Sequence, residues 1–244
     1  MKTAIEIKNL TKQYGTKRAV DALTLSIHQG ELFALLGVNG AGKTTTIKML
    51  SCLTAPTSGE AIVLGHRISD EEQQVRQCIG VSPQETAIAP NLTVRENLEL
   101  MAGVHGFPKA KARQKAEEMI ELFSLQEFAK QKSKTLSGGW QRRLSIAMAL
   151  ISEPQILFLD EPTLGLDILA RRELWAVVEQ LKGRVTIILT THYLEEAEAL
   201  SDRICIMKDG RLKALGTADE LKQQAQTDNF EDAFVKLAAG GMNV

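Results

Sequence analysis

The sequence predicts an α/β fold whose central sheet is mostly parallel, and three apolar runs lead to that prediction. Residues 32–36 and 156–159 are continuously hydrophobic, and residues 185–189 are hydrophobic apart from Thr186, as expected of strands that are covered on both faces. The first two runs are each followed by a turn and then by a segment with helical periodicity. Strands that alternate with helices in this way are typical of an α/β protein with a parallel sheet.

The first part of the chain has a different pattern, which predicts an N-terminal antiparallel β-subdomain. Within residues 3–35, Ile5 and Ile7 alternate with polar residues, and residues 23–27 do the same after a turn near Tyr14. Alternation with a period of two is the pattern of strands that are buried on one face only.

A helical block interrupts the α/β pattern. Apolar residues recur at helical spacing over residues 93–125, and Gly103, Gly106 and Pro108 break the stretch into at least two helices. We therefore expect an inserted α-helical subdomain at residues 85–135. The other predicted parts of this single domain are a core at residues 1–84 and 136–216, with a helix that continues to about residue 152, and a short helical tail at residues 217–244.

Composition narrows the classes of function. The 244 residues are 44% hydrophobic and 24% charged, with a formal net charge of −1, so there is no electrostatic footprint for nucleic acid. No apolar run approaches the roughly 18 residues of a membrane span, and the N-terminus lacks the apolar core of a signal peptide. Cys52, Cys78 and Cys205 are scattered and predict free thiols in a cytosolic protein. Any association with a membrane is therefore expected to go through a partner.

The strongest motif is a P-loop of the form G-x-x-x-x-G-K-[ST] at residues 37–44. It lies between an apolar strand and a helix, which is the context that the motif requires. Its glycines let backbone N–H groups close around phosphate oxygens, Lys43 reaches the β- and γ-phosphates, and Thr44 offers a hydroxyl to Mg²⁺. The motif predicts a P-loop NTPase core that binds a nucleoside triphosphate. The predicted contacts are Gly37, Val38, Asn39, Gly40, Ala41, Gly42, Lys43, Thr44 and Thr45.

Further polar residues follow the other two apolar runs. Asp160 and Glu161 come directly after one strand, at the edge where open α/β sheets hold their ligands. Because successive side chains of a strand point in opposite directions, the two acids are expected to have different roles. We assign Asp160 to Mg²⁺ and Glu161 to a general base that acts on water. His192 ends another strand, and this position favours a contact with phosphate.

Two features are ambiguous from the residues alone. Tyr14 is either a tyrosine at a sheet edge or a stacking platform for a base. Ser137, Gly138 and Gly139 open a helix, where they form either a simple N-cap or a second site for an anion.

Taken together, the motifs resemble those of the ATP-binding-cassette (ABC) ATPases over essentially the whole chain. The residues that carry the resemblance are GVNGAGKT (37–44), Gln84 after a strand, LSGGW (136–140), ILFLDE (156–161), LGLD (164–167) and His192. The resemblance implies that ATP is held between two cassettes, the P-loop of one facing the LSGG segment of the other. Because the chain has one P-loop and one such segment, it is expected to pair with a second copy or with a homologous cassette.

The resemblance also implies a role for each matching residue. Tyr14 stacks on adenine, Gln84 contacts Mg²⁺ and the attacking water, and His192 holds the γ-phosphate. Glu161 and Lys43 complete the catalytic set, and Mg²⁺ is bound through Thr44, Gln84 and Asp160. Ser137, Gly138 and Gly139 bind the nucleotide of the partner cassette, and Asp167 lies at the interface of the dimer.

The sequence departs from the family pattern at two positions. Trp140 stands where glutamine is common, and Leu164 stands where a small residue is common. Neither change removes the serine and glycines expected to touch phosphate, so ATPase activity is still expected. Trp140 packs either at the interface between cassettes or toward the helical block.

Within the family, the chain looks like the ABC-2 and drug-resistance exporters, in which ATPase and permease are separate chains. The segments TTTIKML (44–50) and FEDAFVKLA (230–238) support this. We therefore expect an ATPase subunit on the inner face of the cell membrane that drives a permease, with residues 86–90 either docking the permease or packing internally. The alternatives are a soluble ABC ATPase of translation or DNA repair, and a nucleotide-binding module without turnover.

Overall fold

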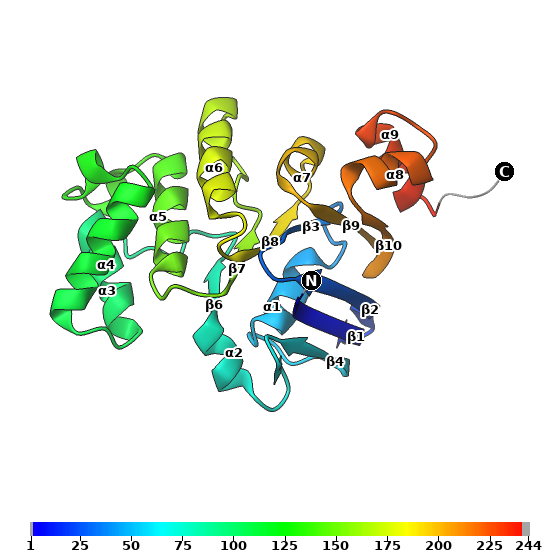
Figure 1. The fold of residues 1–244 in the computed structure, drawn as a ribbon, viewed down its shortest axis with the longest axis horizontal. Coiled ribbons are helices and arrows are strands. Elements are labelled where there is room, and N and C mark those ends of the chain that lie inside the picture. Colours follow the sequence, from blue (N-terminus) through cyan, green and yellow to red (C-terminus); the bar gives the residue numbers. More distant parts are fainter. Residues whose placement is uncertain (1, 241–244) are drawn as a thin grey trace. The chain divides into compact units, whose positions relative to one another are not determined.

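The computed structural model describes residues 2–240, and these fall into two compact units (Figure 1). The first unit combines Met1–Ile79 with Lys182–Val244, and the second is Gly80–Leu181. The last four residues of the predicted tail, 241–244, lie outside the described residues. The P-loop therefore belongs to the first unit, and the segment LSGGW belongs to the second.

An antiparallel sheet forms the N-terminal part of the first unit. Its strand order is β2-β1-β4-β5, with β1 at Thr3–Tyr14, β2 at Lys17–His28, β4 at Ser58–Val63 and β5 at His66–Arg67. Ile5 of β1 lies opposite Ile27 of β2 and Val63 of β4, so the alternating apolar residues meet on one face. The N-terminal antiparallel β-subdomain predicted from the alternation is confirmed.

The same unit contains a mixed sheet. Its central strand β3 (Leu32–Leu36) is entirely buried and pairs in parallel with β8 (Thr186–Thr191) and β9 (Arg203–Lys208). An antiparallel hairpin joins β9 to β10 (Arg211–Gly216) through Asp209 and Gly210, both of which have positive φ. A turn with two positive φ angles matches the twist of the strands it joins. The apolar runs at residues 32–36 and 185–189 therefore form buried parallel strands, as the sequence predicts.

Helices complete the first unit. They are α1 (Lys43–Leu50), α2 (Glu72–Cys78), α7 (Leu194–Leu200), α8 (Ala218–Gln224) and α9 (Phe230–Ala238). The last two cover the hairpin, because Leu221, Phe230 and Leu237 share one core cluster with Ile204 and Ile206. The predicted tail thus packs on the body of its own unit.

The second unit is mostly helical. Its strands β6 (Ile79–Ser82) and β7 (Ile156–Asp160) are neighbours. Its helices are α3 (Val94–Val104), α4 (Lys109–Leu122), α5 (Gly138–Leu150) and α6 (Ile168–Leu181), with short 3₁₀ turns η1 (Gln126–Phe128) and η2 (Ser133–Thr135). Gly106 has a φ of 82° between α3 and α4, at the predicted break. The inserted helices are confirmed, and the subdomain boundaries at residues 85 and 135 stay a prediction.

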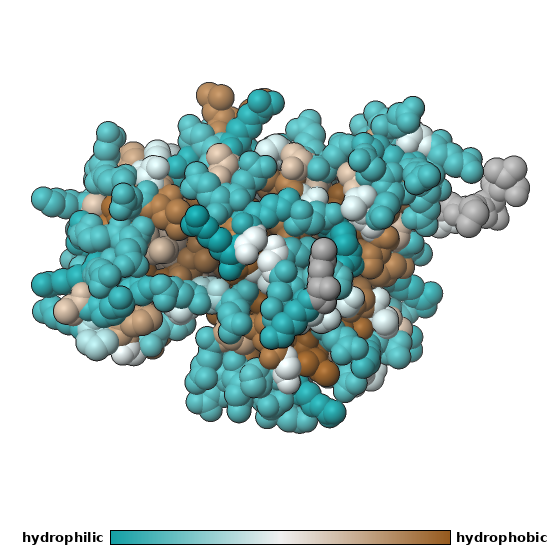
Figure 2. Space-filling view, in the orientation of Figure 1, coloured by the Kyte–Doolittle hydropathy of each residue, from teal (hydrophilic) through white to brown (hydrophobic). Residues whose placement is uncertain are grey.

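The surface in Figure 2 is mostly hydrophilic, with scattered apolar groups. Among the described residues, large exposed apolar side chains include Leu100 and Val104 on α3 and Leu164, Ile168 and Leu169 around the start of α6.

Across residues 2–240, no helix combines the length and the apolar character needed to cross a membrane.

Candidate nucleotide site

The P-loop connects β3 to α1 in the first unit, and its lysine is held inside the loop. Lys43 is only 4% exposed, and its Nζ donates a hydrogen bond to Gly37 O at 2.7 Å. The Gly37 amide in turn donates to Thr191 O at the end of β8, at 3.3 Å. The ammonium group is therefore fixed at the centre of the turn, where it can balance the charge of a phosphate.

The backbone of the loop fits a phosphate group. Gly40 and Gly42 have φ angles of 84° and 103°, and a Cβ on Gly42 would lie 2.4 Å from Ala19 O. Only glycine tolerates that combination. The amides of Asn39, Gly40 and Gly42 donate to no acceptor within residues 2–240. Successive N–H groups of this kind at a helix N-terminus form an anion-binding nest.

Two more predicted residues lie in the first unit. His192 directly follows Thr191, which pairs with Leu36 just before the P-loop, so the sheet brings His192 to the same edge as the loop. Tyr14 ends β1 with 49% of its surface exposed, and Lys12 Nζ lies 5.1 Å from the centre of its ring. The ring is thus available for stacking, as the functional interpretation of Tyr14 requires.

The two predicted acids lie in the second unit, at the end of β7. Asp160 and Glu161 are 4% and 7% exposed. Glu161 has a φ of 47°, a conformation that residues other than glycine seldom adopt. Its carbonyl oxygen accepts hydrogen bonds from Leu164 N at 3.2 Å and from Arg142 Nη2 at 2.9 Å. Strained backbone of this kind is common at functional sites.

Arg142 also holds the predicted glutamine. Gln84 follows β6, and its carbonyl oxygen accepts a hydrogen bond from Arg142 Nη2 at 2.9 Å. Sequence reasoning missed Arg142. The available signal was its position on the same helical face as Ile146 and Ala149, four and seven residues further along α5. An arginine on an apolar face needs acceptors inside the protein.

The LSGGW segment opens α5. Ser137 is the N-cap residue by backbone geometry, but its side chain makes no capping hydrogen bond. The simple N-cap interpretation therefore lacks its defining contact. Trp140 packs against Phe128, with ring centroids 4.5 Å apart, and the guanidinium of Arg143 lies 4.4 Å from the Trp140 ring. Of the two packings left open by the sequence, these contacts correspond to the one toward the helical block.

The remaining predicted residues also lie in the second unit. Asp167 is exposed, and its Oδ1 accepts a hydrogen bond from Ala170 N at 2.9 Å, which caps the start of α6. In the segment 86–90, both backbone polar groups of Ala89 bond to the buried side chain of Asn97 on α3. Ala89 is thus anchored within its own unit, while Ala87 is exposed.

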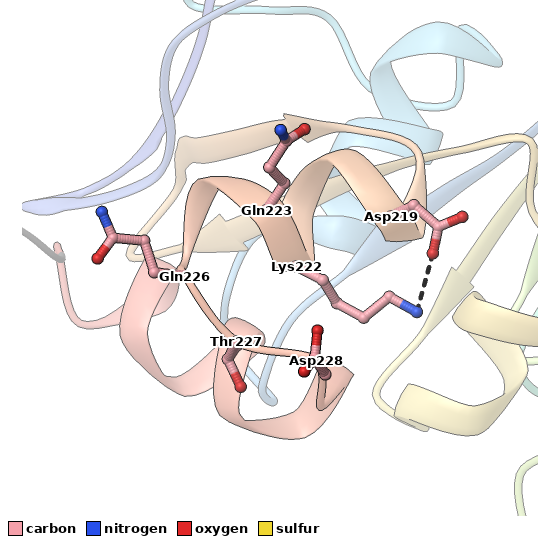
Figure 3. Close-up of a pocket in the computed structure, with 6 residues that line it drawn as sticks. All are labelled: Asp219, Lys222, Gln223, Gln226, Thr227 and Asp228. Carbon is pink, nitrogen blue, oxygen red and sulfur yellow. Dashed lines mark ion pairs between the residues drawn. The ribbon is translucent and has the colours of Figure 1, made fainter.

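A separate pocket lies at α8, away from every predicted site residue in the sequence (Figure 3). It is lined by Asp219, Lys222, Gln223, Gln226, Thr227 and Asp228. The Lys222 ammonium pairs with Asp219 at 2.9 Å, which the dashed line in Figure 3 marks, and with Glu198 at 3.2 Å. Its charge is thus balanced within the chain.

Comparisons with known proteins give a family and several relatives of this chain. The sequence profile of the ABC transporter family matches residues 20–164. The chain is 44% identical, over 94% of its length and 73% of the relative's, to a daunorubicin resistance ATP-binding protein of Streptomyces coeruleorubidus. It is 43% identical to a probable multidrug ABC transporter ATP-binding protein of Escherichia coli, with 96% of this chain and 42% of that longer protein aligned.

A solved structure gives the same fold. It is a dimeric ATP-binding cassette in a post-hydrolysis state bound to ADP and Pi, and it matches with a TM-score of 0.80 and 30% identity, over 87% of this chain and 98% of that one. The family profile covers more than half of this chain, including the P-loop. The chain belongs to the ABC transporter family and is an ATP-binding ABC ATPase.

Proposed function

We propose that this chain is the ATP-hydrolysing subunit of a drug exporter, working as a dimer of cassettes and driving a permease carried on another chain. The observation that carries the proposal is the P-loop, where the buried Lys43 shares one turn with the amides of Asn39, Gly40 and Gly42, which donate to no acceptor within residues 2–240. The relatives that match almost the whole chain are a daunorubicin resistance protein and a multidrug ABC transporter protein, which supports export as the direction of transport.

The P-loop residues hold the triphosphate in this proposal. The amides of Asn39, Gly40 and Gly42 bind phosphate oxygens, Lys43 balances the β- and γ-phosphates, and Thr45 adds a contact from the first turn of α1. The exposed ring of Tyr14 stacks on the adenine.

Magnesium fits the oxygen donors available. Thr44 lies in the first turn of α1, Asp160 ends β7, and Gln84 follows β6, and hydroxyl, carboxylate and amide oxygens are the ligands that Mg²⁺ prefers. When bound, the ion neutralises charge on the β- and γ-phosphates.

Hydrolysis requires a base, and we assign this role to Glu161. Its carboxylate accepts a proton from water that attacks the γ-phosphate, and its low exposure limits competition from bulk solvent. Gln84 orients the water, and His192 donates a hydrogen bond to the γ-phosphate as the charge there rises.

The second cassette completes each site. Ser137, Gly138 and Gly139 present an uncapped helix N-terminus, which is a suitable surface for the γ-phosphate bound by the partner. Asp167 lies in the exposed segment before α6, next to the apolar side chains of Ile168 and Leu169, and is assigned to the interface. Closure of this dimer on ATP is the step that moves the permease, and the chain is peripheral on the inner face of the membrane.

The Glu161→Gln substitution tests the reaction. We expect kcat for ATP to fall by about 10² to 10⁴-fold, the usual contribution of a general base, while ATP still binds. Phosphate release and calorimetry give the two quantities. Glu179→Gln, on the exposed face of α6, is the matched control and should hydrolyse ATP at the wild-type rate. Wild-type turnover by Glu161→Gln would remove this residue from the role of base.

Coupling to a permease is tested by purification. A tagged chain is expressed at its natural level, membranes are isolated, and proteins that co-purify in mild detergent are identified by mass spectrometry. A stoichiometric multi-helix membrane protein is the expected partner. Recovery of ribosomes or DNA instead would favour a soluble ABC ATPase and contradict the transporter role.

A further inference from the structure

Helix α5, which begins with the LSGGW segment, is joined to β6 along one of its faces. A Cβ on Gly80 would lie 2.2 Å from Ala149 O, so strand and helix backbones touch there. Two residues further along β6, the buried hydroxyls of Ser82 and Ser145 are 3.0 Å apart. Ser145 and Ala149 are four residues apart on α5 and therefore share a face of the helix. These contacts fix α5 against the strand that leads to Gln84.

Arg142 extends this row of contacts and adds a second segment to it. Its Nη1 donates to Pro83 O at 2.5 Å, and its Nη2 donates to both Gln84 O and Glu161 O at 2.9 Å. The side chain is 4% exposed. A guanidinium group is planar and presents several N–H donors in a rigid fork, whereas a lysine ammonium is a single flexible point. Arginine can therefore reach all three carbonyl oxygens, whereas lysine cannot match this arrangement.

The contact with Glu161 has a conformational consequence. A φ of 47° is unfavourable for a residue other than glycine and persists only where surrounding contacts hold it. The Glu161 carbonyl is held from two sides, by Arg142 and by Leu164 N. Because the backbone angles set the direction of the side chain, the hydrogen bond from Arg142 also helps to orient the Glu161 carboxylate.

We propose that Arg142 is a positioning residue. It fixes the backbone of Gln84 and the turn at residues 161–164, here called the Glu161 turn, against the helix that begins with LSGGW. This rests on the proposed function. In that function Glu161 and Gln84 serve the nucleotide on this chain's own P-loop, and Ser137 to Gly139 serve the nucleotide of the partner. Arg142 therefore links the two nucleotides of the dimer through one buried guanidinium group.

A purely structural role makes a different prediction. If Arg142 only filled space, an apolar side chain of similar length would replace it without changing the two segments. If it positions them, loss of the guanidinium group must release both segments while the rest of α5 stays folded. The variants Arg142→Met and Arg142→Lys separate these cases, because methionine keeps the apolar stem and lysine also keeps the charge.

The experiment combines kinetics with hydrogen exchange on the full chain. For both variants we expect kcat for ATP hydrolysis to fall by about 10- to 100-fold, the scale of one or two charge-assisted hydrogen bonds, with little change in KM. Amide exchange should rise at least tenfold in peptides that cover residues 82–86 and 160–166, including the Leu164 amide, and should stay unchanged in the later turns of α5. The exchange profile also shows whether each variant is folded.

Arg143→Lys is the matched control. Arg143 is also buried on the same helix, but its guanidinium contacts Glu173 and the Trp140 ring and reaches neither Gln84 nor Glu161. Its substitution should change exchange around Glu173 and leave residues 82–86 and 160–166 protected. Addition of free guanidinium ion at millimolar concentration to Arg142→Ala should restore part of kcat, which a simple packing role does not predict.

Two outcomes would overturn the proposal. One is a folded Arg142→Met protein with wild-type kcat and wild-type exchange in both segments. The other is an equal loss in Arg143→Lys with the same exchange profile. If the wild-type chain itself hydrolyses no ATP, the proposed function fails, whereas the exchange measurements still decide whether Arg142 holds the two segments.

Discussion

At the scale of single residues, buried polar residues define the site, and hydrogen bonds hold several of them in place. Lys43 donates into its own loop, Arg142 donates to three carbonyl oxygens, and Glu161 is held in an unusual backbone conformation. Burial of a charged group is unfavourable unless hydrogen bonds compensate for it. Because Lys43, Arg142 and Glu161 are buried, solubility does not explain these charged residues, and a role in the site does.

The substitution Lys43→Ala is expected to abolish binding of ATP. It removes the only charged group inside the loop, and a charge-assisted contact to phosphate is stronger than the amide contacts that remain. Isothermal titration calorimetry measures the affinity. Lys48→Ala, on the exposed side of the same helix, is the control and should bind ATP normally. Unchanged affinity in Lys43→Ala would refute the phosphate contact.

The cysteines should react with iodoacetamide in an order set by burial. Cys205 is fully buried, and burial raises the pKa of its thiol to about 12, so almost no thiolate exists at pH 8. Burial also raises the pKa of the Cys78 thiol, but this side chain is partly exposed. We expect native protein to be labelled first at Cys78, and at Cys205 only after unfolding, as read by peptide mass spectrometry. Equal labelling of the two would contradict the burial of β9.

At the scale of elements, caps and backbone contacts decide where helices begin and how they attach. Helix α3 starts with a capping box, in which Thr93 Oγ1 accepts from Glu96 N at 3.2 Å and Glu96 Oε2 accepts from Thr93 N at 2.8 Å. Helix α5 starts without a side-chain cap at Ser137. The side-chain cap of α3 suits a helix with a structural role, whereas the uncapped N-terminus of α5 leaves backbone N–H groups for a ligand.

The substitution Thr93→Ala should lower the free energy of unfolding by about 1 kcal/mol at pH 7, the usual value of such a cap. Hydrogen bonds from the Thr93 amide and hydroxyl lower the pKa of the Glu96 carboxyl. Because that pKa is lower in the folded state, the stabilisation is present above the unfolded pKa and is lost as pH falls through the folded value. The difference between wild type and variant should therefore shrink in acid.

Urea denaturation between pH 7 and pH 3 measures this difference. Thr135→Ala is the control, since the Thr135 hydroxyl donates only to Lys132 O within a 3₁₀ turn. A pH-independent difference between wild type and Thr93→Ala would show that Glu96 does not take part in the cap.

At the scale of the whole molecule, the predicted site residues are divided between two units. Tyr14, the P-loop and His192 belong to the first, whereas Gln84, Ser137, Asp160, Glu161 and Asp167 belong to the second. In the proposed function a second cassette adds its LSGGW segment to the nucleotide. A related cassette with the same fold is dimeric and holds ADP and Pi after hydrolysis.

ATP with Mg²⁺ should convert Glu161→Gln protein from monomer to dimer. Because this variant does not hydrolyse ATP, the nucleotide stays bound between the two cassettes and stabilises the dimer. The molar mass of the protein measured by light scattering should therefore double when ATP is present. The double variant Lys43→Ala/Glu161→Gln is the control and should remain monomeric. A monomer of Glu161→Gln with ATP bound would contradict the closed dimer.

Local sequence patterns are sufficient to predict the elements that depend on neighbouring residues. Apolar runs gave the buried strands β3, β7 and β8, alternation gave the antiparallel sheet, and the glycine spacing of residues 37–44 located the P-loop. These patterns are local because strand, turn and helix geometry repeats over a few residues. The two-residue strand β5 was not expected from the sequence, since so short an element has no period.

The contacts between segments that are distant in the sequence become visible only in the folded chain. Arg142 bonds to Gln84 across 58 residues and to Glu161 across 19, and Trp140 turns toward Phe128. The positive φ of Glu161 and the uncapped Ser137 also appear only in the folded chain. The physical reason is that a buried donor is satisfied by whichever carbonyl the fold brings near it, and sequence spacing does not record that meeting. The LSGGW helix therefore has a second role that its motif alone does not reveal, as the proposed support of the Glu161 turn.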